Sequence, residues 1–197
     1  MGRRPRFSTD EILDAALELV IAGGPAAATA TAVGRAIGAP SGSVYHRFAS
    51  RDEMMARLWL RTIENYQRPV IEAVGVDDLD AAADAAIAHC FDWTTEHRGE
   101  AALLLLYDKS DIAAAWPDTL ARELREHNHA ARAALRAYAR RRYGSDDPAV
   151  MDRVTYALVD LPYAAVRRHL PDRGLPAQWL REFTIRSAHE ILTDIGA

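Results

Sequence analysis

The stretch GAPSGSVYHRFASRDEM, residues 38–54, differs in composition from the rest of the chain. It combines two glycines, a proline, three serines and two aromatic residues with several basic ones, whereas the surrounding sequence is rich in Ala, Leu and Arg. A helix that only packs in a core carries apolar side chains at helical spacing. The composition therefore indicates a short element that leaves small polar, aromatic and basic groups exposed.

Helical patterns precede this stretch. Apolar residues over 12–21 recur at helical spacing behind Ser8 or Thr9, either of which can cap the helix, and the Gly-Gly-Pro at 23–25 ends it. Thr29 caps a second, short helix over 30–37, which Gly38 ends.

Pro40 prevents this second helix from continuing, and Ser41 is in place to cap a third helix through Tyr45 or His46. Ser50, with Glu53 three residues later, forms a capping box that begins a fourth helix reaching about residue 71. Within the third helix only Val44 and Phe48, four residues apart, point back toward the small domain.

The remainder of the chain reads as helix throughout, with expected helices over 77–97, 99–107, 118–143, 147–170 and 176–195. No segment alternates apolar and polar residues as a strand does. We therefore predict an all-α protein.

A short helix, a glycine turn and a second short helix form the layout of a helix-turn-helix. The segment TATAVGRAIGAPSGSVYHRFASRDEM, residues 29–54, resembles the N-terminal signature of TetR-type bacterial transcriptional regulators. The matching residues are Gly38, Ser43, Val44, Tyr45, His46, Phe48 and Arg51. Three positions differ from the residues most common in the pattern. Gly34 stands where Ala is common, and Arg47 stands where His or Tyr is common. Arg51 meets the requirement for a basic residue, but with Arg in place of the usual Lys.

The resemblance implies a three-helix helix-turn-helix DNA-binding domain over residues 1–50, joined through the long fourth helix to an effector-binding and dimerisation domain over 51–197. It also implies DNA-binding roles for particular residues of the first domain. Thr29 at a helix N-terminus and the hydroxyl of Tyr45 are expected to contact phosphates. Ser41, Ser43 and His46 are expected to read base edges, and Gly42 lets the helix approach the groove closely. Arg47 and Arg51 are expected to bind phosphates, and an N-terminal arm is expected to reach the adjacent groove or backbone through Arg3, Arg4 and Arg6.

Composition excludes several other classes. The 197-residue chain is 49% hydrophobic with a formal net charge of −4, and its one cysteine, Cys90, cannot form an intramolecular disulfide. The histidines lack metal-ligand spacing, and no catalytic or phosphate-binding motif is present, so we expect no metal, no cofactor and no enzyme activity. No apolar run is long enough to span a membrane, and a cytoplasmic location is expected.

The resemblance further implies a small-molecule site between the fourth to eighth helices, for a moderately lipophilic effector. Candidate lining residues are apolar or aromatic and recur on several helices: Met55, Trp59, Cys90, Trp93, Tyr107, Trp116, Leu120, Leu124, Tyr156 and Tyr163. Core packing is the alternative interpretation of every one of them.

Two C-terminal helices carry more apolar surface than one core needs. The resemblance implies that they pair with their copies in a homodimer, with interface candidates Leu158, Leu161, Ala165, Trp179, Phe183 and Ile191.

Taken together, the sequence predicts a homodimeric repressor that binds double-stranded operator DNA with an affinity set by a small molecule. Two alternatives stay open: an all-α enzyme or small-molecule-binding protein with an incidental helix-turn-helix, and a ligand-independent or activating regulator.

Overall fold

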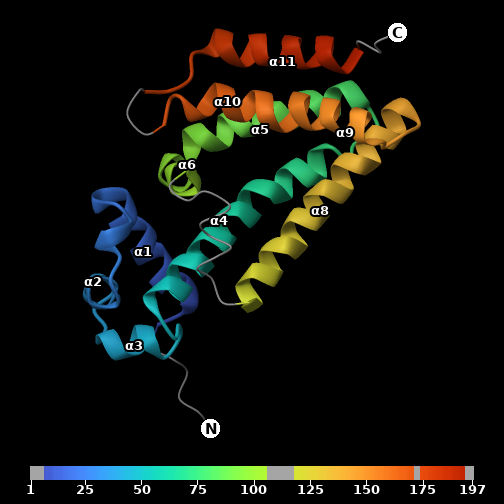
Figure 1. Cartoon of the computed structure of the whole chain (residues 1–197). Coiled ribbons are helices and arrows are strands. Elements are labelled where there is room, and N and C mark those ends of the chain that lie inside the picture. The colour runs from blue at the N-terminus through green and yellow to red at the C-terminus, as the bar shows by residue number, and fades with distance from the viewer. Residues whose placement is uncertain (1–6, 106–117, 171–173, 194–197) are drawn as a thin grey trace. The chain divides into compact units, whose positions relative to one another are not determined.

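The computed structural model describes residues 7–105, 118–170 and 174–193. These residues are helical, with no strand among them, which confirms the all-α fold class (Figure 1). The elements are α1 (Thr9–Gly23), η1 (Pro25–Ala27), α2 (Ala30–Ala36), α3 (Ser41–Tyr45), α4 (Arg51–Ala73), α5 (Leu79–Glu96), α6 (Arg98–Leu105), α8 (Asp118–Tyr143), α9 (Pro148–Thr155), η2 (Tyr156–Asp160), α10 (Leu161–Arg167) and α11 (Gln178–Thr193).

The chain folds into two compact units. The first takes its described residues from 1–63 and 102–124, and the second from 64–101 and 125–197. Helices α4 and α8 each begin in the first unit and end in the second. A domain boundary between residues 50 and 51 stays a prediction.

The N-terminal helices of the first unit begin where the sequence predicts. Ser8 caps α1 in a capping box: its Oγ accepts from the backbone N–H of Glu11 at 3.1 Å, and its own N–H donates to Glu11 Oε2 at 2.6 Å. The hydrogen bond from the Ser8 backbone lowers the pKa of the Glu11 carboxyl. Thr29 caps α2 by accepting from the N–H of Ala32 at 3.1 Å.

The start of α3 differs from the prediction by one residue. Pro40, not Ser41, occupies the N-cap position, and Ser41 is the first helical residue with no capping hydrogen bond from its side chain. Proline is suited to the extended backbone needed there, with φ near −60°. Half of the capping box predicted at α4 is found: Ser50 Oγ accepts from the N–H of Glu53 at 3.0 Å, whereas Glu53 Oε2 accepts from the N–H of Ala49 at 2.6 Å and not from that of Ser50.

The core of the first unit is built from α1, α2, α3, α4 and parts of α6 and α8. Its fully buried side chains include Ile12, Val33, Met54, Leu58 and Leu120. At roughly 1.5–3 kcal/mol for each large side chain removed from water, this burial is the main term that holds these short helices together.

The second unit contains a departure from regular helix. One helix was expected over 147–170, but a π-helical segment over Tyr156–Asp160 separates α9 from α10. Pro162 in the first turn of α10 has no N–H to continue the α-helical bonding. The N–H of Leu161 donates instead to the carbonyl of Tyr156, five residues back.

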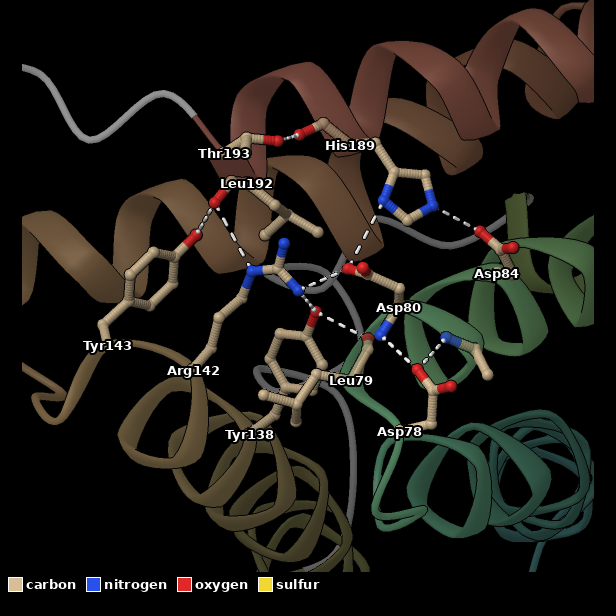
Figure 2. A network of polar contacts seen from close by, with 11 residues as sticks. Asp78, Leu79, Asp80, Asp84, Tyr138, Arg142, Tyr143, His189, Leu192 and Thr193 are labelled. Carbon is tan, nitrogen blue, oxygen red and sulfur yellow. Dashed lines mark hydrogen bonds and ion pairs between the residues drawn. The ribbon is translucent and has the colours of Figure 1, made fainter.

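A polar network fixes the C-terminal part of α11 to α5 and α8 (Figure 2). Arg142 Nη1 donates to Asp80 Oδ1 at 2.7 Å, and Tyr143 Oη donates to the carbonyl of Leu192 at 2.6 Å. His189 Nε2 lies 2.6 Å from Asp84 Oδ1. The hydrogen bond from Arg142 lowers the pKa of the Asp80 carboxyl.

Candidate functional site

Helices α2 and α3 are held together by close backbone contact. The N–H of Ala39 donates to the carbonyl of Gly34 at 2.7 Å, and Gly38 adopts a positive φ of 67° that permits the turn. Val44 and Phe48 are 2% and 3% exposed and anchor α3 in the core of the unit. These features produce a helix-turn-helix.

The other side of α3 faces solvent. Tyr45 is 56% exposed, which is unusual for a large aromatic side chain, and Gly42, His46 and Arg47 are exposed beside it. The side chains of Ser41 and Ser43 are half-buried. This short helix therefore presents hydroxyl, imidazole and guanidinium groups on a surface that its own unit does not cover.

Thr29 is exposed at the N-terminus of α2. Arg47, at the end of α3, donates through Nη2 to the backbone carbonyl of Phe7 at 3.2 Å, and so attaches the start of the chain to α3. The predicted arm residues Arg3, Arg4 and Arg6 lie outside the described residues.

The environment of Arg51 differs from that expected of a free phosphate-binding side chain. Its Nε donates to the carbonyl of Ala28 at 3.1 Å, and its Nη2 donates to the carbonyl of Pro25. These two hydrogen bonds were not expected from the sequence, because no spacing rule relates an arginine to main-chain carbonyls more than twenty residues away.

Two further arginines of α4 form ion pairs within the first unit. Arg61 lies 2.7 Å from Asp14 and 3.4 Å from Asp10, both on α1, and Arg57 pairs with Glu123 on α8. The sequence offered no signal for these pairs beyond the charges themselves.

The effector-site candidates are distributed over both units. Met55, Trp59, Leu120 and Leu124 are at most 8% exposed and belong to the core of the first unit. Cys90 and Trp93 are buried in the second unit. Tyr107 and Trp116 lie outside the described residues.

In the second unit, the ring of Tyr66 contacts the rings of Trp93 and His89. Its ring lies 5.1 Å from that of Trp93 in an edge-on contact and 5.5 Å from that of His89. Trp93 in turn stacks on His97 at 5.4 Å. The sequence analysis assigned Trp93 to the effector site but did not identify Tyr66, because a half-buried tyrosine on a polar helix gives no distinct sequence signal.

The Tyr66 phenol and the Cys90 thiol of this cluster are neutral near pH 7. Burial raises the pKa of the Tyr66 phenol well above its usual value, with smaller contributions from Cys90 and Tyr163. Burial also raises the pKa of the Cys90 thiol to about 11. His89 Nε2 lies 3.0 Å from the carbonyl of Tyr66 and carries the proton of this hydrogen bond, because a carbonyl only accepts.

Tyr156 lies elsewhere in the second unit. It is 51% exposed and lines an open surface hollow of about 420 Å³ with Ala149, Asp152, Arg153 and Ile191. The structure therefore places Tyr156 at a hollow with other lining residues than the neighbours of Tyr66.

Large apolar side chains are exposed on η2, α10 and α11. Tyr163 is 43%, Phe183 54% and Trp179 64% exposed. Arg167 lies over the ring of Tyr163 and Arg186 over that of Phe183, at 5.8 and 6.0 Å. Of the other interface candidates, Leu158 is buried in the core of its own unit, whereas Leu161, Ala165 and Ile191 are half-buried.

Two further features are absent from the described residues. Their His, Cys, Asp and Glu side chains form no cluster of three that could hold a metal ion. None of the helices in this part of the chain is long and apolar enough to cross a membrane.

Comparison with known proteins agrees with the helix-turn-helix geometry. Residues 12–58 match the family model described as bacterial regulatory proteins of the tetR family. No curated protein matches the chain.

Several solved structures share the fold over nearly the whole chain. A transcriptional regulator from Rhodococcus sp. is 21% identical with a TM-score of 0.74, covering 97% of this chain and 100% of that one. The TetR family regulator PfmR from Thermus thermophilus is 19% identical with a TM-score of 0.69, covering 94% and 99%. The transcriptional regulator FadR from Bacillus subtilis, solved in complex with stearoyl-CoA, is 12% identical with a TM-score of 0.67, covering 96% and 100%.

The resemblance seen in residues 29–54 is confirmed, because residues 12–58 match the N-terminal domain of the TetR family and the chain shares the fold of TetR-family regulators. Its N-terminal helices form the DNA-binding domain of this family, and its fold is that of transcriptional regulators. The match of this domain implies DNA-binding transcriptional regulation.

Proposed function

We propose that this chain is a cytoplasmic, homodimeric repressor whose affinity for operator DNA is lowered by a small molecule. The observation that carries the proposal is the solvent-facing side of α3, where Tyr45 is 56% exposed while Val44 and Phe48 fix the helix to its core. An exposed short helix with hydroxyl, imidazole and guanidinium groups is suited to the major groove of DNA.

Recognition divides between bases and phosphates. Ser41, Ser43 and His46 contact base edges, and Gly42 permits close approach because it has no side chain. The fold itself does not require glycine there, since an added Cβ would meet no protein atom within 4 Å. Thr29, Tyr45 and Arg47 contact phosphates and set the position of α3 on the duplex, with the N-terminal arm alongside. Arg51 belongs to the same set of candidates, and its part is treated in the next subsection.

Dimerisation uses the exposed aromatic side chains of α10 and α11. Tyr163, Trp179 and Phe183 are large aromatic side chains exposed on two helices, and exposed apolar side chains that lie together mark protein–protein interaction sites. A second copy of the chain covers them in an isologous interface, which places two copies of α3 on one face of the DNA.

The effector binds in the second unit near Tyr66 and Trp93. Buried aromatic rings with few polar groups suit a moderately lipophilic ligand, and the stearoyl-CoA bound to the FadR of Bacillus subtilis supports a ligand of that character. To release DNA, the ligand must bind the DNA-incompetent arrangement more tightly, because equal affinity for both arrangements shifts nothing. Helix α4 carries the change, since it runs without interruption from Arg51 to Ala73.

Selection from a random-sequence DNA pool, followed by fluorescence anisotropy on the enriched sequence, tests the proposal. We expect Tyr45→Ala to weaken binding to every sequence, whereas Ser43→Ala and His46→Ala change the preferred bases by about 1–3 kcal/mol per contact. Arg132→Met, an exposed substitution on α8, is the control for a lost positive charge. Absence of any enriched sequence, or unaltered selection by both Ser43 and His46 variants, contradicts the proposal.

The two alternatives give different results in the same system. An enzyme or binding protein with an incidental helix-turn-helix enriches no DNA sequence. A ligand-independent regulator enriches a DNA sequence, but lipophilic candidates do not release it. An activating regulator also enriches a sequence, and expression from a promoter fusion is lost when the regulator gene is deleted.

A further inference from the structure

Arg51 connects the first turn of α4 to the connection between α1 and α2. Its Nε donates to the carbonyl of Ala28 at 3.1 Å, and its Nη2 donates to that of Pro25. The side chain is 34% exposed, and Ala28 is fully buried. Two N–H groups of one guanidinium are thus committed to main-chain carbonyls three residues apart.

The guanidinium group is suited to this contact and an ammonium group is not. Arginine presents planar N–H donors in a fixed fork, so that one side chain can satisfy two carbonyls with defined geometry. Lysine keeps the charge but lacks the fork. Arg51 stands where the family pattern has lysine, so the departure noted in the sequence coincides with a contact that only arginine makes in this form.

The carbonyls that Arg51 binds lie next to α2. Ala28 directly precedes Thr29, the N-cap of α2, and α2 touches the turn before α3 through the hydrogen bond from Ala39 to Gly34. A displacement at the start of α4 is therefore passed to α2, and from α2 to α3. The ion pairs of Arg61 with Asp10 and Asp14 join α4 to α1 at a second point.

We infer that Arg51 is a positioning residue for DNA recognition: it orients α2 and α3 against α4 through the carbonyls of Pro25 and Ala28, and it does not itself neutralise a phosphate. This inference rests on the proposed function as a DNA-binding regulator. It identifies the contact by which a movement of α4 alters the orientation of α3.

Salt dependence separates positioning from phosphate binding. A side chain that neutralises a phosphate releases counterions. Its loss therefore makes the fall of log K with log salt concentration less steep, by about one unit of slope. Loss of a positioning residue weakens binding without changing that slope, because the same phosphates remain neutralised. Loss of a purely structural residue lowers the melting temperature and leaves the affinity of the folded protein unchanged.

The experiment measures operator affinity of the full chain between about 50 and about 300 mM salt, a range over which such slopes are resolved, for the wild type, Arg51→Met, Arg51→Lys and Arg47→Met. Circular dichroism at the assay temperature verifies that each variant is folded. We expect both Arg51 variants to bind about tenfold more weakly, as expected for two lost hydrogen bonds, with the wild-type slope. Arg47→Met is expected to lower the slope by about one.

Other outcomes overturn the inference. A lower slope in Arg51→Met that Arg51→Lys restores identifies a phosphate contact, and unchanged affinity in both variants identifies a structural role only. If Arg51→Met does not fold, Arg51→Lys alone decides: weaker binding with the wild-type slope supports positioning, and wild-type affinity contradicts it. Failure of the wild-type chain to bind any DNA contradicts the proposed function instead, and is recognised before any variant is measured.

Discussion

A Cβ atom added at Gly34 would lie 2.8 Å from the backbone carbonyl oxygen of Ala39. The same two residues are joined by the hydrogen bond from the Ala39 N–H to the Gly34 carbonyl at 2.7 Å. Helix α2 and the turn before α3 therefore meet backbone to backbone. The glycine that lowers helix propensity at this position is the residue that allows the contact.

We predict that Gly34→Ala destabilises the protein, although alanine favours helix by about 1 kcal/mol. The atom in the way belongs to the backbone, so α3 must shift, and overpacking of this kind costs roughly 1–3 kcal/mol. Gly42→Ala is the matched control, because a Cβ at that position meets no atom within 4 Å. Urea unfolding of the two variants decides: equal stability contradicts the role given to Gly34.

The exposed aromatic side chains of α11 give a second prediction. Phe183→Glu places a charge on the proposed interface while leaving the core of the unit intact, since Phe183 is 54% exposed. We expect monomers in sedimentation velocity with unchanged helix content. Ile21→Glu, at another exposed apolar side chain, is expected to remain dimeric. Leu158 is unsuitable for this test, because it is buried within its own unit and a charge there would unfold it.

Trp93 tests the effector site. Trp93→Phe keeps an aromatic ring against Tyr66 but reduces its area, so we expect weaker response to fatty acyl and aromatic ligands with operator affinity nearly unchanged. Anisotropy of labelled operator DNA, titrated with each ligand, measures the response. Trp59→Phe, in the core of the other unit, is the control and is expected to lower the melting temperature without changing ligand response. Equal loss of operator binding and melting temperature in Trp93→Phe identifies Trp93 as core only.

Acid titration tests the network around α11. The hydrogen bond from Arg142 lowers the pKa of Asp80 in the folded state, so this carboxylate stabilises the fold at pH values above its unfolded pKa of about 4. The stabilisation is lost as pH falls through the folded pKa. We expect Asp80→Asn to be less stable than wild type at about pH 6, and the difference to vanish toward about pH 2. A difference that is constant with pH excludes this role for the Asp80 charge.

Local signals predicted the beginnings of the helices well. Side chains at Ser8, Thr29 and Ser50 satisfy backbone N–H groups only three residues away, so the sequence contains both partners of each contact. Ser41 was misassigned as a cap because Pro40, which cannot extend a preceding helix, itself adopts the extended N-cap conformation. The exposed side of α3 was also predictable from local sequence, since its residues are polar and do not form an apolar pattern at helical spacing.

Contacts between distant residues were not predictable. The carbonyl groups bound by Arg51 and the aromatic neighbours of Tyr66 depend on how helices pack, and many packings satisfy the same apolar pattern. Trp59 and Trp93 illustrate the limit: both lie at helical spacing among apolar residues, yet Trp59 belongs to the core of the first unit and Trp93 is buried in the second. Burial alone does not distinguish a pocket wall from core packing.

The π-helical segment over Tyr156–Asp160 has a consequence for partner choice. Each residue in an α-helix turns the chain by about 100°, so removing one residue from this segment would rotate everything beyond it by that angle about the helix axis. Tyr163, now exposed, would then take the position of Pro162 on the buried side of α10, where Val166 also lies. A chain that lacked one residue of this segment would present its α10 side chains out of phase with those of the full chain, and in the proposed dimer the two would pair poorly. The length of this short segment thus sets which side of α10 faces outward, without any change in the side chains themselves.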